Sequence, residues 1–248
     1  QAAMITEYEL YSDEREHKNA GEKRLLLGGV VCTDKGRERI CNALSHVRAD
    51  FSLSHEMRWT KVSNAYLDAY KAWMDVFFDH PYARFSVHNT NLSGPKWRAF
   101  RPEQRSRRSR DDKLASAFYQ FLLVTFGPLR DTKRWWVYPD AGFFSRDDVL
   151  NRVEYLFNLT YKKAFGPKTS RIIRFAQSRD SKSQDIIQLA DLLLGASACN
   201  TFGPIPSSEA KRSLVEHWQQ RLEKIPKTTR GIDRFSQYLW VPPDEFPY

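Results

Sequence analysis

Four acidic residues stand at positions from which they could do chemistry together: Asp13, Glu56, Asp140 and Asp191. Asp13 follows the alternating segment ITEYEL, and Asp140 follows WWVYP, where a proline stops a predicted strand. A carboxylate at the end of a strand can project into a crevice at the sheet edge and bind a hard cation there. Taken singly, each aspartate could also belong to an ordinary solvated loop, and Glu56 could be an ordinary surface glutamate.

The helix predicted over residues 183–199 adds weight to Asp191. At 100° per residue, Gln184, Gln188, Asp191 and Gly195 fall within about 60° of one another, and apolar residues fill most of the remaining circumference. A buried carboxylate without a partner costs several kcal/mol. Asp191 therefore needs a cation, a basic partner or a water-filled cleft. Asp185 lies off this stripe and suits the helix N-terminus.

Other catalytic motifs fit poorly. Pro139-Asp140 begins like a PD…(D/E)xK nuclease motif, but the downstream match, Glu209-Ala-Lys211, falls at a predicted helix start. The six histidines show no i,i+4 pair or HxxEH spacing, and the chain contains neither a GxxxxGK[ST] loop nor a GxSxG elbow.

One stretch, residues 94–113, is unusually basic. Its cations are Lys96, Arg98, Arg101, Arg105, Arg107, Arg108, Arg110 and Lys113, with Trp97 and Phe100 between them. Arginines can grip phosphates and aromatic rings can stack on bases, so the run is a candidate nucleic-acid-binding loop. The net charge of +9 agrees with a polyanionic partner. The alternative is a solvated charge run.

Periodicity predicts two strands in a hairpin, over 5–12 and 23–32, with the stretch YSDEREH (11–17) read by itself as a solvated turn. Further strands are predicted over 83–87, 133–138 and 171–176, and helices over 37–49, 64–78, 111–126, 147–165, 183–199 and 211–223. Residues 56–59 are ambiguous. This order predicts an α/β fold with a mixed sheet.

With 41% hydrophobic residues, the chain can bury a substantial core. We expect one domain over 4–200, with a basic insertion at about 91–113, and a C-terminal helix and aromatic tail, 201–248, packed on it. Three scattered cysteines and no apolar run of bilayer length lead us to expect a reducing cytoplasm and no membrane contact.

These pieces together resemble a largely uncharacterised bacterial family with an N-terminal YxDES-G motif and a C-terminal DSK…QxAD motif. The matching stretches are YSDE (11–14), GGVV (28–31), EMRW (56–59), VYPD (137–140), RDSKS (179–183) and QLAD (188–191). Members of that family are regarded as having a ribonuclease H-like fold. The sequence departs from the motif at Arg15-Glu16, where the family has Ser-Gly, which raises a question about the turn after Asp13.

The resemblance implies a two-metal site. Asp13, Glu56, Asp140 and Asp191 would hold two Mg²⁺ or Mn²⁺ ions, with one activating water and the other stabilising the leaving 3′ oxygen. Glu14 would assist as a neighbouring ligand, Gln188 would orient a ligand or a phosphate, and Lys182 would contact the scissile strand.

The resulting hypothesis is a metal-dependent nuclease acting on RNA or DNA. One alternative is a nucleic-acid-binding protein with a degenerate ribonuclease H-like site, which the Arg15-Glu16 departure favours. Another is a defence or toxin component that needs a protein partner or a second copy, with the aromatic tail as a docking segment.

Overall fold

The computed structural model describes residues 6–19, 22–91, 110–126, 133–143, 147–165, 172–201, 206–223 and 235–240. Its six strands form one mixed sheet in the order β5-β4-β1-β2-β3-β6. They are β1 (Thr6–Asn19), β2 (Glu22–Thr33), β3 (Arg84–Asn91), β4 (Lys133–Pro139), β5 (Ile173–Ala176) and β6 (Phe235–Trp240). β1, β2 and β3 pair antiparallel, whereas β4 runs parallel to β1, β5 to β4 and β6 to β3.

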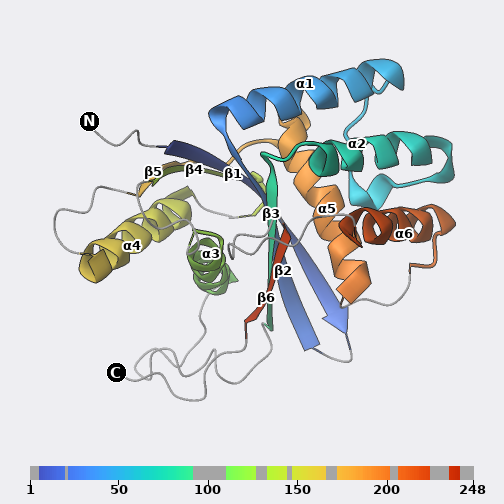
Figure 1. Ribbon diagram of the computed structural model, residues 1–248. Helices are drawn as coiled ribbons and strands as arrows, with labels where there is room; N and C mark the ends of the chain where they lie inside the picture. The colour runs from blue at the N-terminus through green and yellow to red at the C-terminus, as the bar shows by residue number, and fades with distance from the viewer. Residues whose placement is uncertain are drawn as a thin grey trace.

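Helices cover both faces of this sheet, so the predicted mixed α/β architecture is confirmed (Figure 1). One face carries α1 (Asp34–Asp50), α2 (Leu67–Asp79), α5 (Asp185–Thr201) and α6 (Glu209–Glu223). The other carries α3 (Arg110–Phe126) and α4 (Asp147–Phe165). The alternation of β2 divides the two cores, because Leu26 and Val30 face the α5 side while Leu25 and Leu27 face the α3 side.

The first strand is longer than predicted, and the prediction that residues 11–17 by themselves form a solvated turn is wrong. β1 continues through this stretch and stays paired with β2, with Asp13 opposite Gly28 and Arg15 opposite Leu26. The acidic residues extend the strand because β2 offers a continuous apolar partner in the same register. The question of turn geometry at Arg15-Glu16 therefore does not arise.

Two glycines allow α5 to pack closely on its neighbours. A Cβ on Gly28 would lie 2.9 Å from Leu194 Cδ1, and one on Gly195 would lie 2.2 Å from Trp59 Cδ2. At Gly28 the backbone of β2 packs directly on α5. At Gly195 the backbone of α5 packs directly on the indole of Trp59. The Gly28-Gly29 pair allows neighbouring side chains to approach the backbone of β2 closely, and the pairing register of β1 and β2 continues through it.

The C-terminal part joins the same core. Leu214 and Trp218 of α6 are buried in the cluster that contains α2 and α5, and Phe235 of β6 packs against it. The sequence did not predict a strand at 235–240. No helix in the part of the chain described is long and apolar enough to cross a membrane.

Replacing Gly195 with alanine should destabilise the protein by about 2 kcal/mol, because the added methyl has no space beside Trp59. This loss would exceed the gain of about 1 kcal/mol that alanine brings to a helix interior. Urea unfolding measures the difference. Gly142→Ala is the control, since its nearest neighbour would be a carboxylate oxygen at 3.5 Å; equal stability of the two variants would contradict the packing argument.

Candidate active site

The register of β1 and β4 places two of the predicted aspartates side by side. Tyr11 pairs with Tyr138 across these parallel strands, and their rings lie 5.1 Å apart. Two residues further along each strand come Asp13 and Asp140, and the Asp140 N–H donates to Ser12 O at 2.9 Å. Because residues two apart share a face, both aspartates project from the α5 side of the sheet.

Helix α5 brings the third aspartate to the same place. It crosses β1 and β2 on this face (Figure 1), and glycine opposite Asp13 keeps the approach close. Asp191 lies on the helix side that turns toward the segment before α2, and its Oδ2 accepts the Trp59 N–H at 2.8 Å. The polar stripe predicted on this helix thus faces residues 56–59.

The segment 56–59 supplies the fourth carboxylate, that of Glu56. Side chains along this segment alternate between the core and the cleft. Met57 and Trp59 are buried in the core, at 0% and 1% exposure, and their N–H groups donate to the Gln188 and Asp191 side chains. Glu56 and Arg58 alternate with them and both line the cleft. The alternation is already visible in the sequence EMRW, although residues 56–59 were predicted as neither strand nor helix.

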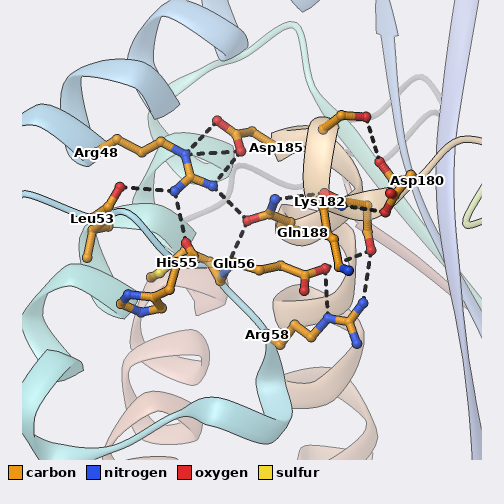
Figure 2. A network of polar contacts seen from close by, with 12 residues as sticks. Arg48, Leu53, His55, Glu56, Arg58, Asp180, Lys182, Asp185 and Gln188 are labelled. Atoms are coloured by element: carbon orange, nitrogen blue, oxygen red, sulfur yellow. Dashed lines mark hydrogen bonds and ion pairs between the residues drawn. The ribbon is translucent and has the colours of Figure 1, made fainter.

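Gln188 ties this segment to the start of α5. Its Oε1 accepts from Met57 N at 2.8 Å and from Arg48 Nη2 at 2.9 Å, while its Nε2 donates to Ser181 O at 2.7 Å. Arg48 also binds Asp185 and the carbonyl of His55, as Figure 2 shows. One amide therefore fixes two separate segments that carry cleft residues.

Ser181 joins the remaining pieces. Its N–H donates to Asp140 Oδ1 at 3.1 Å, and its hydroxyl donates to Glu56 Oε1 at 2.7 Å. This serine follows β5, after Arg179 has formed a bridge to Asp140. The RDSKS stretch thus crosses the end of β4 and links a strand-end aspartate to Glu56.

These side chains surround a cleft of about 390 Å³. Its lining residues are Asp13, Glu14, Arg15, Glu16, Glu56, Arg58, Thr60, Asp140, Ser181, Gln188 and Asp191. Six of these are acidic and two are arginines, so the lining carries a formal excess of four negative charges in a chain whose net charge is +9. The cleft is therefore acidic, although the chain as a whole is basic.

The carboxylates in the cleft have unequal electrostatic surroundings. Burial raises the pKa of Asp13 well above its usual range, and the charges of Asp191, Glu14 and Asp140 raise it further. Burial also raises the pKa of Asp191, against the Trp59 N–H and the charge of Arg15, which lower it. For Glu56, burial acts upward, but hydrogen bonds from Ser181 and Arg58 hold its pKa below the ordinary value.

The donor types and the charge suit a divalent cation, since carboxylate oxygens are the ligands that Mg²⁺ and Mn²⁺ prefer. Asp13 and Asp191 are forced together against their mutual repulsion, which a bound cation would relieve. Within the described ranges, however, no three histidine, cysteine, aspartate or glutamate side chains stand ready to hold one ion. Glu56 is instead bound to Arg58 and Ser181.

The other predicted residues are placed as follows. Glu14 and Gln188 line the cleft, whereas Lys182 is exposed on a 3₁₀ turn (Ser181–Ser183) and is not part of the lining. Arg110 begins α3, but its side chain lies outside the description. Lys96, Arg98, Arg101, Arg105, Arg107 and Arg108 lie outside the described residues.

Four residues of the site were missed by sequence reasoning: Arg15, Arg48, Arg58 and Ser181. The alternation of EMRW could have placed Arg58 beside Glu56, and the alternation of β1 could have placed Arg15 on the face of Asp13. The role of Arg48, 140 positions before Gln188, gave no local signal. Comparison with protein-family models and with curated proteins found no match for this chain.

Gln188→Ala should lower the free energy of unfolding by about 2 kcal/mol, because it leaves the buried Met57 N–H and the Ser181 carbonyl without their side-chain partner. Chemical denaturation provides the measurement. Gln184→Ala is the control, one turn earlier and just before the start of α5, with an expected change within about 0.5 kcal/mol. Similar losses in both variants would argue against a special role for Gln188.

Asp13→Asn should stabilise the metal-free protein at neutral pH, because the neutral amide escapes the desolvation and the repulsion from Asp191 that raise the pKa of Asp13. A folded-state pKa above the unfolded value means that the native state keeps its proton longer, so wild-type stability falls as pH rises above about 4. The asparagine variant should show a flatter decline over the same range. Denaturation from pH 4 to pH 8 in EDTA measures this, and parallel curves would contradict it.

Proposed function

We propose that the protein is a metal-dependent nuclease that hydrolyses phosphodiester bonds in RNA or DNA. The observation that carries the proposal is the meeting of Asp13, Glu56, Asp140 and Asp191, from four separate segments, in one acidic cleft. A basic chain with such a cleft combines attraction for a polyanion with a place for the cations that phosphoryl chemistry needs.

The fold supports a ribonuclease H-like assignment. In such a site an aspartate on the first strand meets acidic residues from a later segment, a central strand end and a final helix. Here β1 lies inside the sheet beside β4, Asp140 directly follows β4, and Asp191 lies on α5, which packs on β1 and β2. The resemblance to the bacterial family with DSK…QxAD motifs is part of the same proposal.

Asp13, Asp140 and Asp191 would hold the cations, with Glu56 joining them and Glu14 close by. Two Mg²⁺ or Mn²⁺ ions would supply the charge that activates water and stabilises the leaving 3′ oxygen. In the hydrolysis, a water molecule loses a proton as its oxygen bonds to phosphorus, the bond between phosphorus and the 3′ oxygen breaks, and the 3′ oxygen takes up a proton. Gln188 positions the backbone of the 56–59 segment, and Arg15 and Arg58 offer positive charge to the phosphate.

A second candidate is a nucleic-acid-binding protein with a degenerate site. It is favoured by the ion pair between Arg58 and Glu56, which gives one carboxylate an internal cation at 2.7 Å. Titration calorimetry with Mn²⁺ separates the two candidates: a nuclease binds the ion through Asp13 and Asp191, whereas a degenerate site gives no heat that depends on them.

Asp13→Ala and Asp191→Ala should each lower Mg²⁺- or Mn²⁺-dependent cleavage at least about 100-fold, because each removes a ligand from the charge-stabilising centre. The assay uses end-labelled single-stranded, duplex and hybrid oligonucleotides. Asp34→Asn is the matched control, an exposed aspartate outside the cleft. Wild-type cleavage by both alanine variants would rule out the assignment.

A further inference from the structure

The proposed chemistry gives Arg58 only a general role, as a source of positive charge in the cleft, although its side chain is already bound within the protein. Its Nε lies 2.7 Å from Glu56 Oε1, and its Nη2 donates to the Ser181 hydroxyl at 3.1 Å. Ser181 in turn donates to the same Glu56 oxygen at 2.7 Å. We call these three side chains the Arg58 clasp; Figure 2 shows Glu56 and Arg58 joined side by side.

The backbone on either side of Arg58 is fixed, but its side chain is not enclosed. The N–H groups of Met57 and Trp59 are both held by α5 side chains, and the backbone of Arg58 is extended, with φ −121° and ψ 144°. Its side chain is 42% exposed, while that of Glu56 is 9% exposed. The guanidinium can therefore change partners at the cleft without moving the segment.

The carboxylates of the cleft are unequally compensated by positive charge. Glu56 binds Arg58 directly, while Asp13 and Asp191 repel each other across the same cleft, with the charges of Arg15 and Arg58 acting on Asp191. A divalent cation that settles between those aspartates also attracts Glu56, and a carboxylate that turns to the cation releases Arg58. A freed guanidinium beside a phosphodiester forms bidentate hydrogen bonds with phosphate oxygens, which suit its planar fork.

We propose that Arg58 is a substrate-binding residue that exchanges Glu56 for a phosphate of the nucleic acid backbone when a divalent cation occupies the cleft. The inference rests on the proposed function. It makes metal and nucleic acid binding cooperative, and by linkage each must strengthen the other by the same factor. Ser181, bonded to both Glu56 and Asp140, holds the place from which Glu56 turns.

The decisive experiment is a double-mutant cycle on Glu56 and Arg58 without metal. Fluorescence anisotropy in EDTA measures binding of labelled phosphorothioate oligonucleotides, both RNA and DNA. Glu56→Gln breaks the clasp and frees Arg58, so binding should tighten roughly three- to tenfold. In the Arg58→Ala background the same Glu56→Gln change should have little effect, since the freed group is absent. Equal tightening in both backgrounds would mean that only charge matters and would overturn the exchange.

A second arm adds Mn²⁺. Wild-type protein should bind the oligonucleotides several-fold more tightly with Mn²⁺, and Arg58→Ala should lose this dependence while keeping the metal-free affinity. Calorimetry should show tighter Mn²⁺ binding by Arg58→Ala, because the competitor for Glu56 is gone. Arg58→Lys, which keeps the charge but not the planar fork, should restore only part of the cooperativity. Arg174→Ala, an exposed arginine outside the cleft, should behave as wild type.

The outcomes separate the two proposals. If Mn²⁺ binds to wild type and to Arg58→Ala with equal affinity and equal effect on the oligonucleotide, the exchange is wrong and the nuclease proposal stands. If no variant binds Mn²⁺, the nuclease proposal and the metal-triggered exchange fail together. A positive cycle in EDTA would then still identify Arg58 as a phosphate contact that Glu56 restrains.

Discussion

The close packing of α5 on β1 and β2 is the constraint on which the site depends. Gly28 has no side chain opposite Asp13, so the helix approaches the strand backbone and carries Asp191 to the same cleft. Two half-buried carboxylates are thereby brought near one another, and loss of solvent and repulsion raise the pKa of Asp13. The apolar contacts of α5, which is buried on nearly every side, supply the free energy that holds this unfavourable pair in place.

The second constraint is the network around Gln188. The 56–59 segment is not paired with a strand of the sheet. Side chains of α5 that accept hydrogen bonds from its N–H groups hold it in position. Arg48 reaches the same amide from α1, so a helix far away in the sequence stabilises the site. The three segments that meet there are held by hydrogen bonds which are costly to leave unmade in the interior.

Much of the fold could be predicted from the sequence, because its helices and most of its strands have clear periods. The polar stripe on α5 was predicted from the same periodicity, and the cleft lining contains Gln188 and Asp191 from that stripe. The prediction failed at residues 11–17, where charged residues form a strand because β2 pairs with them. It also missed Arg58, which the alternation of EMRW could have placed beside Glu56, and Ser181, whose role arises from contacts between segments that local patterns do not encode.

The manner in which α5 holds residues 56–59 has a consequence for how such a site can change. Gln188 and Asp191 grip main-chain N–H groups, while the side chains of Met57 and Trp59 fill the core. The cleft-facing positions 56 and 58 contribute nothing to that grip. Substitutions there can therefore change the charge pattern over the cleft while the scaffold stays the same, which gives evolution and protein engineering a coupled pair of positions, joined by the ion pair between Glu56 and Arg58, for retuning selectivity.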